Sequence, residues 1–156
     1  DAPIVVGDAR VKLGYVADDA YDLLLLDAFS SDSVPTHLLT REAMGLYLDK
    51  LDADGVLVFH VSNRHLDIAP VVARIAEAAG AVAVHQVYRP DEAAAERGAS
   101  ASEVVMVSRK SEALGLARVS GKWSELESDG GRPWTDDYSN IIGAMLARAF
   151  ADKAAN

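Results

Sequence analysis

The sequence predicts an α/β fold built on a mostly parallel sheet with helices on both faces. Short apolar runs of strand length alternate with helical patterns along most of the chain. The run Tyr21 to Leu26 holds four consecutive leucines without alternation, which is typical of a strand buried on both faces of a parallel sheet. The last two apolar runs have no obvious helix between them, so we expect an antiparallel pair at one edge.

The strands are expected where β-branched residues or leucines form short continuous runs, at residues 4–6, 21–26, 56–61, 81–88 and 103–108. Asp54-Gly55 is expected to be a turn before the third of these, and the polar, alanine-rich stretch 89–102 is expected to be a loop or lid.

Capping residues and apolar periodicity predict the helices. Thr40 can cap a helix in which Met44, Tyr47, Leu48 and Leu51 form one apolar stripe. Asp67 is expected to cap the next helix and Gly80 to end it. The expected helices are residues 11–17, 41–51, 68–79, 111–117 and 141–150.

The length, charge and composition of the chain limit the kinds of protein that it can be. The chain has 156 residues, so we expect one domain over residues 1–150 and a frayed tail at 151–156. Its formal net charge of -9 argues against non-specific nucleic-acid binding and suits a small cationic partner. It has no cysteine, no apolar run long enough to span a membrane and no basic leader segment, so a cytoplasmic location is expected.

Carboxylates at the end of the leucine run are the first candidates for chemistry. Ligands of open α/β sheets bind beyond the carboxyl ends of the strands. Asp27 stands at that position, and Asp32 follows in a small polar loop. Asp136 and Asp137 could face the same cleft. Each has a plainer alternative, because aspartates also cap helices, form turns or lie solvated on the surface.

Other groups of residues give weaker evidence for a functional site. The four histidines, His37, His60, His65 and His85, have no metal-ligand spacing, so no metal site is expected. A hydrolase built from Ser30, His60 and Asp27 lacks the G-x-S-x-G elbow. The chain also lacks a G-x-G-x-x-G turn, so it looks like the second half of a Rossmann-like domain.

The motifs V-G-D-A-R, Y-D-L-L-L-L-D with a nearby S-S-D, and D-G-V-L resemble the spermidine synthase family. These aminopropyltransferases have the Rossmann-like methyltransferase fold. The longer string DAFSSDSVPTHLLTREAMGLYLDKLDADGVLVFHVSNRHLD and the later PWTDDYSNI are similar to an uncharacterised bacterial branch, some members of which are fused to membrane transporter segments. The resemblance runs from Ile4 to about Ile142.

This resemblance implies roles for individual residues. Asp8, with Ala9 beside it, matches the aspartate that binds the adenine amino group. Asp27 matches the aspartate that orients and deprotonates the attacking amine, and Asp32 the one that holds the cationic polyamine. Apart from these three matches, Asp136 and Asp137 are expected to be substrate-binding residues of the same cleft. The implied co-substrate is decarboxylated S-adenosylmethionine or S-adenosylmethionine, with no tightly bound cofactor.

Departures from the family pattern leave alternatives open. The glycine-rich turn and the acidic residue that holds the ribose would precede Asp1, and no P-T-Y-P-S-G loop is present. This chain is therefore expected to lack the first strands and a complete nucleoside site, and to form a homo-oligomer that covers the open edge. The alternatives are a fragment of an S-adenosylmethionine-dependent methyltransferase and a non-catalytic dimerisation or ligand-sensing domain.

Overall fold

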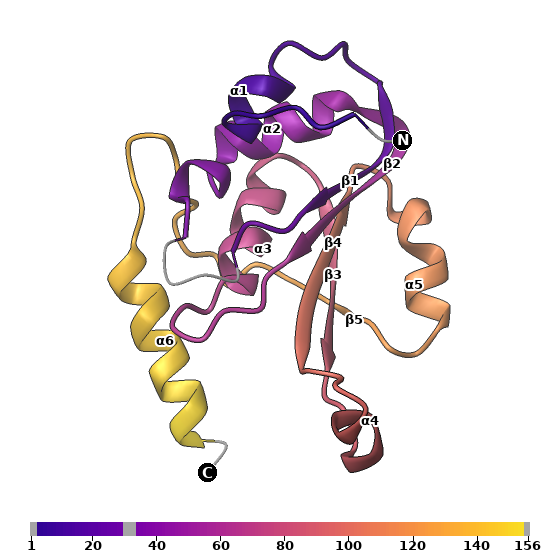
Figure 1. Cartoon of the computed structure of the whole chain (residues 1–156). Helices are drawn as coiled ribbons and strands as arrows, with labels where there is room; N and C mark the ends of the chain where they lie inside the picture. Colours follow the sequence, from indigo (N-terminus) through magenta and orange to yellow (C-terminus); the bar gives the residue numbers. More distant parts are fainter. Residues whose placement is uncertain (1–2, 30–33, 155–156) are drawn as a thin grey trace.

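The structure, a computed structural model, describes residues 3–29 and 34–154. Its centre is a five-stranded sheet in the order β1-β2-β4-β3-β5 (Figure 1). The strands are β1 Tyr21–Leu26, β2 Leu51–His60, β3 Val82–Tyr88, β4 Ser102–Ser108 and β5 Ser124–Glu125. The helices are α1 Ala9–Leu13, α2 Arg41–Lys50, α3 Ala69–Ala78, α4 Glu92–Glu96, α5 Gly115–Val119 and α6 Ile141–Ala154, with 3-10 turns at Thr36–Leu38 and Ser111–Leu114.

The α/β class is confirmed, and the sheet is mixed. β1 and β2 are parallel, whereas β4 is antiparallel to both β2 and β3. β1, β2 and β3 therefore point the same way, and β4 lies reversed between two of them. The antiparallel pairing of β3 with β4 is as predicted, because the chain between them holds only the short α4 and has no crossover helix that would return it parallel.

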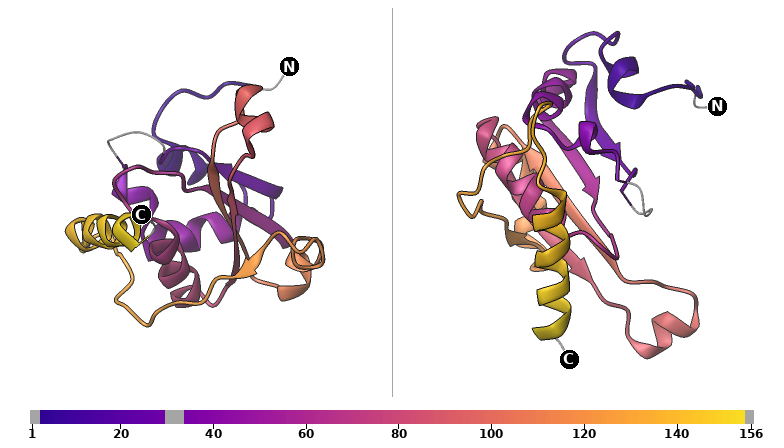
Figure 2. Two further views of the ribbon diagram at one scale, coloured as in Figure 1. Left: turned by 90° about the horizontal axis from the view of Figure 1, so that it is seen from below. Right: turned by 90° about the vertical axis from the view of Figure 1, so that its left-hand side faces the viewer.

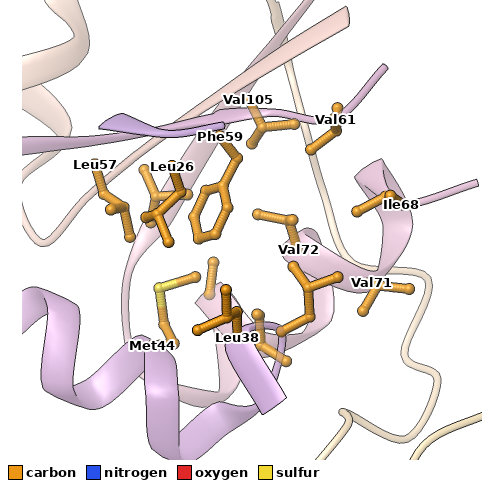
Figure 3. Close-up of a cluster of buried hydrophobic side chains, with 14 of the residues drawn as sticks. Leu26, Leu38, Met44, Leu57, Phe59, Val61, Ile68, Val71, Val72 and Val105 are labelled. Carbon is orange, nitrogen blue, oxygen red and sulfur yellow. The ribbon is translucent and has the colours of Figure 1, made fainter. Parts of the chain in front are cut away.

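The core lies between one face of the sheet and helices α2 and α3. Helices α2 and α3 cover this face of the sheet, and α6 lies outside α3 (Figure 1; Figure 2, left). Leu57 and Phe59 from β2 and Val105 from β4 project toward Met44 and Val72 of these helices (Figure 3). All five side chains are fully buried. Alternation along the strands places their even-numbered neighbours on the opposite face.

That opposite face is uncovered at β1. Leu23 is 58% and Leu25 63% exposed, and β1 is an edge strand of the described sheet. The prediction of a strand buried on both faces is therefore wrong for the described residues. The predicted strand at residues 4–6 is also absent: Ile4, Val5 and Val6 are exposed and have no strand partner in the described chain. A strand needs a neighbour for its backbone hydrogen bonds, and the apolar pattern alone supplies none.

Several element boundaries differ from the predictions because tertiary contacts decide them. β2 includes Asp54-Gly55 as an irregular part of the strand, since its register with β1 shifts between the Leu51 and Val56 pairs, and the Ser108 hydroxyl donates a hydrogen bond to the Gly55 carbonyl. The cap position of α3 is Ile68 and not Asp67. α1 begins two residues early, α4 occupies part of the expected loop, and α6 continues four residues past Phe150 into the expected tail.

Candidate active site at the carboxyl ends of the first two strands

Asp27 lies where the sequence predicts, directly after β1. Its side chain is 57% exposed, and its Oδ1 atom lies 2.8 Å from Nδ1 of His60. His60 is the last residue of β2, the parallel neighbour of β1. Two side chains from the carboxyl ends of adjacent parallel strands thus meet at one edge of the sheet, which is the usual place for ligands in such folds.

His60 continues the contact to a third side chain. Its Nε2 atom lies 2.8 Å from the Ser62 hydroxyl, and that hydroxyl accepts a hydrogen bond of 2.8 Å from the backbone N–H of Glu103. The pairing of Asp27 with His60 assumed in the hydrolase alternative is present, but the serine next to His60 is Ser62. Ser30 and Asp32 lie outside the described residues.

Asn63 fastens the loop after β2 to the loop after β1. Its Nδ2 atom donates a 2.6 Å hydrogen bond to the carbonyl of Phe29, and its Oδ1 accepts from the backbone N–H groups of His65 and Leu66. The residue is buried. Sequence reasoning missed Ser62 and Asn63, although they follow a buried strand just as Asp27 does, and that position was the available signal.

A second group gathers around Asp8. Asp8 caps α1 by accepting a 2.9 Å hydrogen bond from the Val11 N–H, and its other oxygen lies 2.8 Å from Nε2 of His37. The hydrogen bond from Val11 is the largest cause that lowers the pKa of Asp8, and His37 adds to it. The plainer alternative for Asp8, a local backbone contact, is thus present as a helix cap. Ala9 begins α1 and is exposed.

Asp136 joins this second group through Arg10. Both of its oxygens accept hydrogen bonds of 2.7 Å from the Arg10 guanidinium, and Thr40 donates a further one of 2.8 Å. The Arg10 bonds are the main cause that lowers the pKa of Asp136. Arg10 also donates to the His37 carbonyl, so α1, the 3-10 turn and the 135–138 turn are held together.

These contacts surround a small cleft of about 200 Å³. It is lined by Thr36, His37, Thr40, Thr135, Asp136, Asp137, Tyr138 and Ser139. The structure therefore brings Asp8, Asp136 and Asp137 into one neighbourhood and pairs Asp27 with His60. In the described part of the chain, no hydrogen bond links the two groups.

Residues 3–29 and 34–154 contain no group of three or more histidines, aspartates or glutamates placed to hold a metal ion. Within the same residues, no helix combines the length and the hydropathy that a membrane span requires.

Comparison with known proteins supports the assignment of the fold. No family model matches the chain. The crystal structure of a probable spermidine synthase from Corynebacterium glutamicum ATCC 13032 superposes with a TM-score of 0.56 at 16% identity, over 88% of this chain and 55% of that one. The crystal structure of MNMC2 from Aquifex Aeolicus gives a TM-score of 0.46 at 22% identity, over 68% of this chain and 30% of that one. The first of these superpositions shows that the chain has an α/β fold like that of the spermidine synthase structure.

A curated relative extends the likeness to the sequence. A polyamine aminopropyltransferase from Vibrio vulnificus (strain CMCP6) is 44% identical over 54 residues, which are 33% of this chain and 18% of that protein. The sequence resemblance to the spermidine synthase-like family is therefore confirmed. The chain spans about half the length of the similar solved structure, and its match covers less than a fifth of the curated relative.

Proposed function

We propose that the protein carrying this chain transfers an aminopropyl group from decarboxylated S-adenosylmethionine to a small polyamine, and that Asp27 receives the proton of the attacking amine. The observation that supports this most is the position of Asp27: an exposed carboxylate at the carboxyl end of β1, with one oxygen held by His60. The similarity to the aminopropyltransferase from Vibrio vulnificus supports the reaction class.

The chemistry requires a proton acceptor. An alkylamine titrates near pH 10.4, like lysine, so it is mostly protonated and not nucleophilic at neutral pH. In the proposed step Asp27 accepts a proton from the substrate ammonium and fixes the freed amine nitrogen in line with the leaving group. That nitrogen attacks the methylene next to the sulfonium sulfur, the carbon–sulfur bond breaks, and methylthioadenosine leaves, while the secondary ammonium that forms keeps its own proton.

The remaining carboxylates have different parts in this proposal. Asp32 keeps the role that the resemblance implies, binding the distant ammonium of the amine, and Asp137 lines the cleft of about 200 Å³. Asp136 is paired on both oxygens with Arg10, so its charge is already neutralised within the protein. Asp136 therefore shapes the cleft, and Asp8 and Ala9 are proposed to meet the adenine.

Substitution of Asp27 tests the function. The experiment uses the longest protein that the gene encodes and measures methylthioadenosine release from decarboxylated S-adenosylmethionine with putrescine. Asp27→Asn keeps the shape but removes the base, and kcat is expected to fall by about 10²–10⁴-fold. The control is Asp22→Asn, which removes an exposed carboxylate from the same strand and is expected to leave kcat unchanged.

The melting temperature of each preparation separates catalysis from folding. If Asp27 only stabilises a turn, Asp27→Asn lowers the melting temperature and leaves the kcat of the folded fraction intact. That result, or transfer of a methyl group from S-adenosylmethionine in place of an aminopropyl group, would overturn the proposal.

A further inference from the structure

The side chains of Asp27, His60 and Ser62 form a continuous chain of hydrogen bonds on one face of the sheet. Asp27 follows Leu23 and Leu25 at a spacing of two residues, and His60 alternates with the core residue Phe59, so both project to the same side as Leu23 and Leu25; Ser62 follows His60 at the same spacing. This is the side opposite the helix-covered core. This series of hydrogen bonds ends at the backbone of β4, where Glu103 donates its N–H to the Ser62 hydroxyl.

The hydrogen-bond donors and acceptors of Asp27, His60 and Ser62 can be arranged in only one way when Asp27 is ionised and His60 is neutral. An ionised carboxylate only accepts hydrogen bonds, so Nδ1 of His60 carries the hydrogen and donates it to Asp27. Nε2 is then the bare nitrogen and accepts from the Ser62 hydroxyl. The Ser62 oxygen in turn accepts from Glu103.

Backbone hydrogen bonds at the end of the sheet hold Ser62 in place. Val61 donates its N–H to the Glu103 carbonyl at 2.8 Å, and Glu103 returns its own N–H to the Ser62 hydroxyl. The Ser62 side chain thereby extends the ladder between β2 and β4 by one bond. His60 is held on one ring nitrogen by this ladder and on the other by the carboxylate.

We infer that His60 and Ser62 are positioning residues for Asp27. They hold Oδ1 in place and leave Oδ2 as the oxygen that faces the attacking amine; in the described chain, Oδ2 has no hydrogen-bond partner. Ser62 acts through His60, which it keeps as the Nδ1–H tautomer. The inference deepens the proposed function and rests on it for the identity of the reacting amine.

The tautomer of His60 is a test that needs no activity. Nitrogen-15 NMR of the imidazole, assigned with a His60→Gln variant, is expected to show the hydrogen on Nδ1 and a bare Nε2 near neutral pH. Ser62→Ala removes the donor to Nε2, so the tautomers are expected to become mixed. A signal from an Nε2–H tautomer in the unmodified protein would overturn the inference, even if aminopropyl transfer were confirmed.

Kinetics supply the second test. In the assay above, Ser62→Ala is expected to lower kcat by up to about 10²-fold, as expected for a small displacement of a catalytic group, with little change in the KM of putrescine. Ser62→Thr keeps a hydroxyl and is expected to restore most of the rate. Ser120→Ala is the matched control, because Ser120 is a distant exposed serine whose hydroxyl bonds only the backbone of Ala117 and Lys122, both within three residues. Unchanged kcat in Ser62→Ala, with the unmodified enzyme active, contradicts the inference alone.

A different outcome would reassign Ser62. The order carboxylate, histidine, serine is also that of a nucleophilic triad. A burst of nitrophenol from an activated acetate ester, lost in Ser62→Ala, would identify Ser62 as a nucleophile and overturn its positioning role. If neither aminopropyl transfer nor this burst is seen, the proposed function fails, while the NMR result still decides whether the three side chains are linked as described.

Discussion

At the scale of single residues, Thr40 connects the fold to the candidate cleft. The side chain is only 2% exposed; its hydroxyl oxygen accepts a 3.1 Å hydrogen bond from the Ala43 N–H and so caps α2. The same hydroxyl donates to Asp136. The buried Thr40 hydroxyl therefore bonds an N–H group in the first turn of α2 and also positions the Asp136 carboxylate, which is paired with Arg10.

Thr40→Ala is expected to lower the free energy of unfolding by about 1–2 kcal/mol, because it leaves the first turn of α2 without its cap. Urea denaturation measures this change. Thr40→Ser, which keeps the hydroxyl, is expected to lose much less. If the alanine and serine variants are equally stable, the hydroxyl contributes nothing and the cap is not a stabilising contact.

At the scale of elements, bidentate ion pairs tie helices to distant loops. Arg74 on α3 donates hydrogen bonds of 2.6 and 2.5 Å to the two oxygens of Asp129. Arg10 binds Asp136 in the same manner from α1. The Arg74 guanidinium lowers the pKa of Asp129 well below its ordinary value of 3.8, and the Gly131 N–H adds to the effect.

This pair predicts a pH dependence of stability. Because the folded-state pKa of Asp129 lies below the unfolded value, the contribution is complete above about pH 4 and is lost as the pH falls through the lower, folded-state value. The carboxylate is largely exposed and screened by water, so the contribution is expected to be about 1 kcal/mol or less.

Measured from pH 7 to pH 2, the stability difference between the unmodified protein and Asp129→Asn should shrink as the pH falls. In the Arg74→Gln background, the Asp129→Asn change is expected to have little effect at any pH. A difference that stays constant with pH would show that the ion pair does not stabilise the fold.

At the scale of the whole molecule, β1 is an edge strand of the sheet formed by residues 3–29 and 34–154, and it also has an apolar face. Leu23 and Leu25 are more than half exposed there, next to Asp27. Exposed edges of this kind pair readily with other chains. We propose that, in a preparation of the 156-residue chain alone, a second copy covers this side.

Light scattering at micromolar concentration is expected to report a dimer or a larger assembly. Leu23→Glu with Leu25→Glu should shift the population toward monomer, because charge on the face opposes its burial. Leu116→Glu is the control, since that leucine is 85% exposed on α5, a different element. A monomer before any substitution would contradict the proposed self-association.

The sequence by itself determined the α/β class, the span of β1, the Thr40 cap and the place of Asp27. These depend on local signals: apolar runs, one hydroxyl before a helix, and a carboxylate after a buried strand. The antiparallel pairing of β3 with β4 was also predictable, because the short connection between them holds no crossover helix.

Only the tertiary structure decided what surrounds those residues. Which strand neighbours which is a matter of long-range pairing, and only that pairing places His60, thirty-three positions along the chain, against Asp27. The exposure of Leu23 and Leu25 depends on which elements cover β1, and an apolar run is the same whether or not a partner is present. Asp8 and Asp136 lie in one neighbourhood because Arg10, on the helix that Asp8 caps, binds Asp136, a contact with no periodicity that a sequence pattern could show.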